Sequence, residues 1–176
     1  MDGEVMSINV INSDWMHCAH LGVWQEYLGS ILHLLFYDML PGTPEENCRC
    51  MHSELKAYWT VNPNPGHYQN LQFNMIRSAT GYPCLKGRAA EIKKMAPALL
   101  ELWGMHRTTD HTSPDFVLHS QINLLLKKFC LADEILDAHP PREYPKLPLA
   151  AQQRFEAACW DMLKVMNWIS HFFYVH

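Results

Sequence analysis

The sequence predicts a mainly α-helical protein with about five helices around one core and one short N-terminal strand. The chain has 176 residues, of which 48% are apolar and 18% charged, which suits one globular domain. Apolar residues recur at helical spacing over several long segments. Clusters of proline, glycine and asparagine separate these segments. We therefore expect a single helical domain over residues 1–176.

The elements are predicted in chain order from these patterns. Residues 5–11 alternate loosely between apolar and polar side chains, which is typical of a short strand. Thr43 and Pro44 are typical of a helix start, because threonine caps the helix and proline suits its first position. A further helix is predicted within "GYPCLKGRAAEIKKMAPALLELWG". Pro97 predicts a kink in this helix, and Gly104 predicts its end. The other helices are predicted at residues 21–39, 43–59, 113–139 and 149–175.

Two shorter stretches complete the prediction. Residues 71–76 suit either a strand or a helix, and the proline-rich residues 139–148 predict an extended connector. The strand at residues 5–11 has no obvious partner strand, and the last helix ends while it is still apolar. These two features predict that the chain is a fragment of a larger protein.

The charge of the chain limits the classes of partner. A formal net charge of −4 and a pI near 6.2 are the opposite of what a self-sufficient nucleic-acid binder has, so any DNA contact must be local. One group of basic residues is a candidate DNA contact, although a solvated helix face explains it as well. Its members are Lys86, Arg88, Lys93 and Lys94.

The expected cellular location is inferred from the first residues of the chain and from its apolar segments. The first dozen residues do not have the basic start and apolar core of a signal peptide, and no apolar run approaches the roughly 18 residues of a membrane span. We therefore expect an intracellular protein without membrane contact. Its six cysteines are then expected to be reduced thiols.

A metal site is one alternative for the histidines and cysteines. Zinc takes four nitrogen, sulfur or oxygen ligands, and "HCAH" and "CRCMH" each supply part of such a set. The candidate ligands are His17, Cys48 and His52, of which the last two share a helix face. Their spacing differs from that of zinc fingers, so unrelated thiols and imidazoles remain the other interpretation.

Two segments carry a resemblance to a known family. "INSDWMHCAHLGVWQEYLGSIL" contains a D-x-M-H-x-x-x-L-G pattern, and the later segment contains P-x-L-K followed by A-A-E. In this order they resemble transposases and transposase-derived proteins of eukaryotic DNA transposons, especially CACTA-like elements. The matching residues are Asp14, Met16, His17, Leu21, Gly22, Pro83, Leu85, Lys86, Ala89, Ala90 and Glu91.

The resemblance implies a fold, a cofactor and a partner. Such transposases have an RNase H-like core with a DDE triad, bind Mg²⁺ or Mn²⁺, act on DNA in the nucleus, and carry a [C/D]-x-x-H signature where a helical insertion begins. Asp14 and His17 match that signature, although Asp14 also suits an ordinary helix cap. Glu156 is the candidate for the last catalytic acid.

The match is incomplete, and it leaves alternatives open. The family's first catalytic aspartates lie upstream of the signature, and only thirteen residues precede Asp14, so no full triad can be built. We therefore expect a helical fragment that is not an enzyme by itself. One alternative is a helical interaction module whose apolar stripe, Met162, Met166, Ile169 and Phe173, docks on a partner helix. A zinc-binding helical domain is the second alternative.

Overall fold

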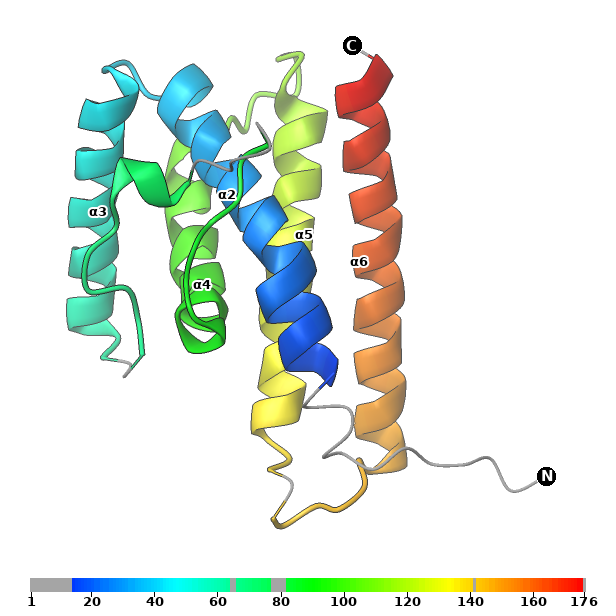
Figure 1. Cartoon of the computed structure of the whole chain (residues 1–176). Coiled ribbons are helices and arrows are strands. Elements are labelled where there is room, and N and C mark those ends of the chain that lie inside the picture. Colours follow the sequence, from blue (N-terminus) through cyan, green and yellow to red (C-terminus); the bar gives the residue numbers. More distant parts are fainter. Residues whose placement is uncertain (1–13, 64–65, 77–81, 141, 176) are drawn as a thin grey trace. The chain divides into compact units, whose positions relative to one another are not determined.

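The described part of the chain is built from helices. The computed structural model describes residues 14–63, 66–76, 82–140 and 142–175, with side chains as far as His171. Within these residues lie five α-helices and no β-strand (Figure 1). The prediction of a mainly helical protein is therefore confirmed. The strand predicted at residues 5–11 lies outside the described residues.

The chain divides into two compact units, which we describe separately. The first unit is Met16–His106; the described residues of the second are Asp14, Trp15 and those from Arg107 onward. The prediction of one domain around one core stays a prediction. The first unit contains α2 (Trp24–Leu34), α3 (Pro44–Val61) and α4 (Ala89–His106), and the second contains α5 (Phe116–Asp137) and α6 (Leu149–Val175).

The first helical segment starts earlier than predicted. A π-helical segment, η1 (Met16–Val23), precedes α2, and a second one, η2 (Leu35–Met39), follows it. The backbone leaves helical geometry inside η1 at Gly22, where φ is −110° and ψ is −105°. Glycine tolerates such a backbone better than other residues do, so the chain changes direction there without losing the following helix.

The start of α3 is where the sequence places it. Thr43 Oγ1 accepts a hydrogen bond from the Glu46 N–H, and the Glu46 carboxylate accepts one from the Thr43 N–H, which forms a capping box. The buried Asn47 side chain then closes the turn after η2, because its amide donates to Phe36 O and Gly42 O and its carbonyl accepts from Gly42 N. The polar backbone of a buried turn is thereby satisfied.

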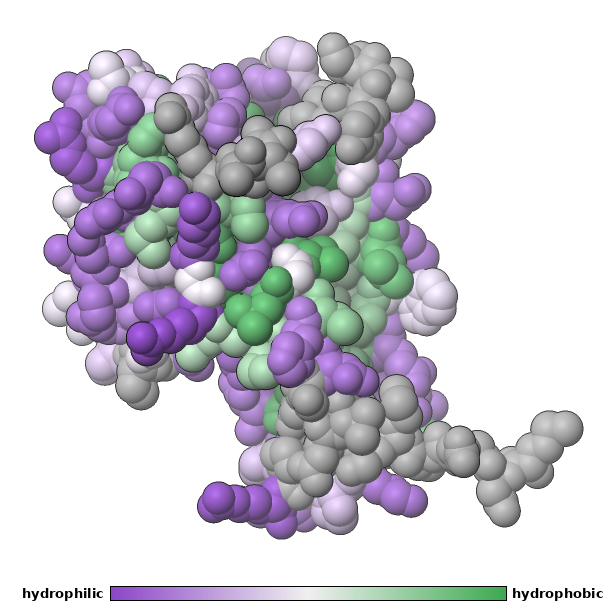
Figure 2. Space-filling model, in the orientation of Figure 1, coloured by the Kyte–Doolittle hydropathy of each residue, from purple (hydrophilic) through white to green (hydrophobic). Residues whose placement is uncertain are grey.

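The core of the first unit lies where α4 packs against α2 and α3. It is formed by fully buried side chains such as Trp24, Leu28, Met51, Leu99 and Trp103. The outer side of α3 is hydrophilic (Figure 2). Helix α4 therefore presents apolar side chains to two neighbours, which explains why so much of it is buried.

Helix α4 passes through both residues that were predicted to interrupt it. Pro97 lies inside the helix, and Gly104 lies two residues before its end at His106. The predicted end at Gly104 is therefore wrong. A helical glycine costs only about 1 kcal/mol relative to alanine, and burial of the adjacent Trp103 offsets this. Within residues 71–76 the chain forms a short 3₁₀ helix, η3 (Phe73–Met75), and no strand.

In the second unit, α6 runs antiparallel to α5 and packs along it (Figure 1). An ion pair with 2.6 Å between Lys128 Nζ and Asp161 Oδ2 joins the two helices. The connector before α6 turns at Pro140, whose carbonyl accepts from the N–H groups of Glu143 and Tyr144. Its last buried residue, Leu147, completes a cluster with Ile135, Leu136 and Ala151.

Candidate functional site

Two of the four residues predicted to contact DNA, Lys86 and Arg88, lie in an extended segment that is fixed on the first unit. We call residues 84–88 the strap. Hydrogen bonds to α2 and to the loop that contains η3 hold its backbone at five points. These bonds are Cys84 N to Ile76 O (3.1 Å), Leu85 N to Gln25 O (2.8 Å), Lys86 N to Met75 O (2.7 Å), Tyr68 Oη to Lys86 O (3.1 Å) and Gln25 Nε2 to Gly87 O (3.2 Å).

Side chains alternate along the strap as they do along a β-strand. Leu85 is fully buried, whereas Lys86 and Arg88 are exposed. Residues two apart in an extended segment lie about 6–7 Å apart on one side. The strap therefore presents two positive charges side by side on a backbone that is already ordered.

Two glycines allow the strap to lie close to α2 and to Tyr68. A Cβ at Gly29 of α2 would lie 2.6 Å from Leu85 N, and a Cβ at Gly87 would lie 1.9 Å from Tyr68 Oη. Neither distance is compatible with a larger side chain unless the backbone or the buried Tyr68 moves. Only glycine fits at these two crossings.

The other two predicted DNA contacts are placed differently. Lys93 and Lys94 lie in the first half of α4 and are half-buried. At the start of that helix the Glu91 carboxylate accepts a hydrogen bond from the Arg88 N–H (2.8 Å). The fully exposed part of the predicted basic group is therefore Lys86 and Arg88, which precede the helix rather than lie on it.

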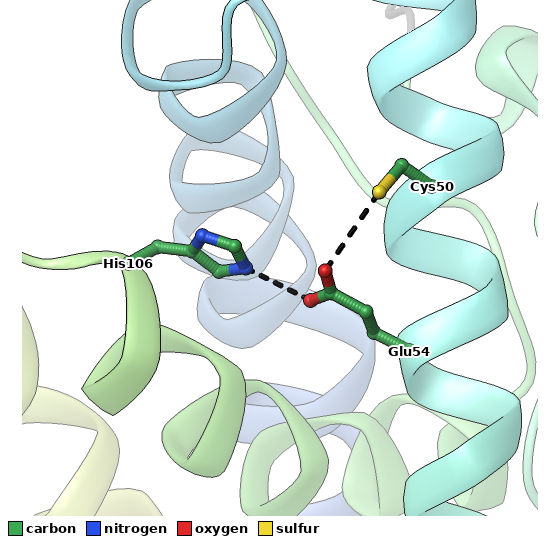
Figure 3. A network of polar contacts seen from close by, with 3 residues as sticks. All are labelled: Cys50, Glu54 and His106. Atoms are coloured by element: carbon green, nitrogen blue, oxygen red, sulfur yellow. Dashed lines mark hydrogen bonds and ion pairs between the residues drawn. The ribbon is translucent and has the colours of Figure 1, made fainter.

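A separate polar network joins α3 to the end of α4 (Figure 3). The Glu54 carboxylate accepts from the Cys50 thiol through Oε1 (3.7 Å) and lies 2.8 Å from His106 Nε2 through Oε2. In a nucleophilic triad the imidazole lies between nucleophile and carboxylate, whereas here the carboxylate is central. Partial desolvation and then the Glu54 charge raise the pKa of Cys50, so this thiol is held protonated.

The three predicted zinc ligands do not assemble. Burial raises the pKa of Cys48 to about 11, and His52 Nε2 accepts a hydrogen bond from the Leu71 N–H (3.3 Å). That bond occupies the lone pair which a metal ion would need. His17 is exposed on η1. Within the described ranges, no three histidine, cysteine or acidic side chains lie where they could hold a metal ion.

The two acids that were predicted as candidates for catalysis border a contact that the sequence did not predict. Trp15 Nε1 donates to Oδ1 of the buried Asp133 on α5 (3.0 Å), and the Trp15 ring packs edge-to-face on Phe155 of α6 (centroids 5.1 Å apart). The exposed Asp14 and Glu156 are the chain neighbours of Trp15 and Phe155. A catalytic role for either acid stays a prediction. In the sequence, the contact between Trp15 and Asp133 is signalled only by the position of Asp133, an aspartate on an otherwise apolar helix face.

The apolar stripe predicted to receive a partner helix belongs to the second unit's own core. Met162 and Ile169 are each 4% exposed, and α6 packs along α5. The prediction that these two side chains dock on a partner is therefore wrong, because the chain itself covers them. Met166 is half-buried, and the Phe173 side chain lies beyond the last described one.

Comparisons of the chain with protein-family models, with curated proteins and with solved structures find no match. The transposase resemblance thus stays a prediction from the two motifs. Among the described helices, none combines the length and apolar character that crossing a membrane requires.

The sequence analysis did not identify Gln25 and Tyr68, which hold the strap by hydrogen bonds. The glycine after Lys86 was the only signal in the sequence for this contact.

Proposed function

We propose that this chain is a helical, DNA-associated module of transposase descent that contacts the sugar–phosphate backbone through Lys86 and Arg88. The observation that carries the proposal is the strap, which presents these two exposed cations from a backbone fixed by hydrogen bonds. Lysine and arginine are the side chains that bind phosphates, and a fixed backbone lowers the entropy lost on binding. The same strap lies in the second of the two transposase-like motifs.

Such binding is weak and independent of base sequence. Each cation that neutralises a phosphate releases condensed counterions, so affinity falls as salt rises. The net charge of −4 opposes approach to DNA and limits the affinity further. A role of this kind supports the grip of a larger assembly on DNA and belongs in the nucleus.

No cleavage step is part of the proposal. Transposases of the family hold Mg²⁺ or Mn²⁺ with a cluster of acids. The described residues do not fit such an ion, because no group of three suitable side chains comes together among them. The proposed role of the chain is therefore to hold DNA.

The proposal is tested by fluorescence anisotropy with a labelled DNA duplex titrated at several salt concentrations. We expect the natural chain to bind at low salt and the double variant Lys86→Ala/Arg88→Ala to bind more weakly. The slope of log K against log salt should fall by about 2, since two phosphate contacts are lost.

A matched control removes two exposed cations elsewhere. Lys127→Ala/Arg154→Ala changes the net charge by the same amount and alters only the second unit. It should leave the slope nearly unchanged. Equal losses in both double variants would mean that overall charge, and not the strap, binds DNA; absence of binding at low salt would refute the proposal.

Descent is tested separately from binding. We expect the flanking genomic DNA to extend the reading frame upstream into strand-forming sequence that carries two further aspartates, with inverted repeats at the ends of the element. A stop codon directly upstream in every copy, with no repeats, would contradict the proposed origin.

A further inference from the structure

The outer face of α6 is exposed and contains large apolar side chains. At 100° per residue, residues at steps of three and four around Trp160 lie within about 60° of it. The core-facing residues Ala158, Met162 and Ile169 lie on the opposite side of the helix and are buried. Every residue of the outer face is exposed: Leu149, Gln153, Glu156, Ala157, Trp160, Leu163, Lys164, Asn167 and His171.

Trp160 and Leu163 dominate this face. They are 64% and 56% exposed, although residues of their kind are usually covered. The two lie one turn apart and form one contiguous apolar area with Ala157. An exposed tryptophan beside an exposed leucine is typical of an interaction surface.

The charges on this face are arranged symmetrically about Trp160. Glu156 lies four residues before it and Lys164 four residues after it. If two copies of α6 pack antiparallel with their Trp160 residues at the centre, the turn that carries Glu156 lies beside the turn that carries Lys164 of the partner subunit. Opposite charges then meet twice, whereas parallel packing would place like charges together.

Both side chains are available for this pairing. The Lys164 side chain is 76% exposed, and its Nζ lies 3.9 Å from Asp161 Oδ1, which Lys128 engages more closely through the other oxygen. Glu156 is exposed, and its only hydrogen bond given by the described residues comes from Gln152 Nε2 (2.9 Å). Pairing with a second copy therefore breaks no strong interaction within the chain.

We propose that the chain forms an antiparallel homodimer through the outer face of α6, with Trp160 and Leu163 at its centre and Glu156 paired with Lys164 of the partner subunit. The contact is isologous, because one patch meets its own copy across a two-fold axis. A single helix pair buries less than a standard interface of about 1,600 Å², so the dimer is weak and forms at high protein concentration.

The test is sedimentation velocity of the full chain over a concentration series at low salt. We expect a concentration-dependent dimer for the natural chain. Each single reversal, Glu156→Lys or Lys164→Glu, places like charges together and should weaken association by about tenfold or more. A mixture of the two variants should dimerise again, since each supplies the charge that the other needs. Arg154→Glu, a reversal on α6 outside this face, is the matched control.

The mixing experiment decides the identity of the partner. Circular dichroism of each variant confirms that these surface changes leave the helices intact. A natural chain that stays monomeric, or a dimer that both single reversals leave unchanged, would overturn the proposal. Binding of the monomer to vesicles of anionic phospholipid, lost in Trp160→Ala, would assign the face to a membrane surface instead and would equally overturn it.

Discussion

Glu54 is the residue that gives the polar network of the first unit its chemical character. One of its oxygens receives the Cys50 thiol and the other faces His106, so one carboxylate joins two helices. Its negative charge opposes ionisation of the neighbouring thiol. The network is therefore a structural clamp at the surface of α3, with a thiol of low reactivity.

Replacing Glu54 should make Cys50 more reactive. In Glu54→Gln the charge that disfavours the thiolate is gone, while the desolvation that is the larger cause of the raised pKa remains. We expect alkylation of Cys50 by iodoacetamide at pH 8 to accelerate by about two- to threefold, because the gain in thiolate is partly offset by lower nucleophilicity. Site-resolved mass spectrometry measures the rate.

The control for this prediction is Glu101→Gln, which removes an exposed charge from α4. It should leave the Cys50 rate unchanged. If Glu54→Gln slows alkylation or has no effect, the carboxylate does not control the thiol.

For single residues, the sequence predicted which residue types are chemically important better than it predicted which residues they contact. Cys48 and His52 share a face of α3 as the spacing required, yet burial and the bond from Leu71 give each a structural role. Cys50 joins a network through Glu54, which lies four residues further along α3. The second partner of Glu54 is His106, which lies 52 residues away in the sequence. Helical periodicity gives no information about such a distant contact.

At the scale of elements, the crossing of the strap over α2 decides what Gly29 may be. Alanine normally stabilises a helix relative to glycine by up to about 1 kcal/mol. At Gly29, however, the added Cβ would lie 2.6 Å from Leu85 N and 2.7 Å from Cys84 Cα, which are backbone atoms. The strap would have to move away from α2 and lose its hydrogen bond to Gln25 O.

We expect Gly29→Ala to lower the free energy of unfolding by about 1–3 kcal/mol, because overpacking against a backbone outweighs the gain in helix propensity. Gly104→Ala in α4 is the matched control, since a Cβ there meets nothing within 4 Å. It should leave stability unchanged or raise it. Urea unfolding of both variants measures the difference, and a stabilised Gly29→Ala would show that the strap does not press on α2.

Helix boundaries followed from local chemistry where that chemistry was strong. Thr43, Pro44 and Glu46 specify the start of α3, and the last helix has its predicted bounds. Boundaries failed where tertiary contacts override local preference, as at Gly104. The strap was unpredictable for the same reason: its extended form depends on hydrogen bonds from Gln25 and Tyr68, which are distant in the sequence.

At the scale of the whole molecule, buried titratable groups limit stability to a range of pH. Burial lowers the pKa of His52 and His119, and each ring accepts a hydrogen bond from a backbone N–H that protonation would break. Burial also raises the pKa of Cys130 to about 12 and that of Cys159 to about 11. The folded chain therefore favours the neutral form of these two histidines and two thiols.

The sign of each effect follows from proton linkage. Below about pH 6.5 the unfolded chain binds more protons at the two histidines, so stability falls as pH decreases. Above about pH 8.5 the unfolded chain loses thiol protons that the folded chain keeps, so stability falls as pH increases. We expect urea midpoints to be highest between these limits.

One variant tests the loss of stability at low pH separately from the loss at high pH. His119→Asn keeps an acceptor near the Thr108 N–H and removes one titrating ring, so its midpoint should fall less between pH 7 and pH 5 than that of the natural chain. An equal fall in both proteins would show that His119 contributes nothing to the acid limb.

The hydrogen bonds of the strap also affect the order of folding. Gln25 and Gly87 lie 62 residues apart in the sequence, so their contact closes a long loop and carries a large entropic cost. Contacts of this kind form late, after local helices such as α2 and α3. We therefore expect the segment that carries Lys86 and Arg88 to become fixed on α2 only late in folding.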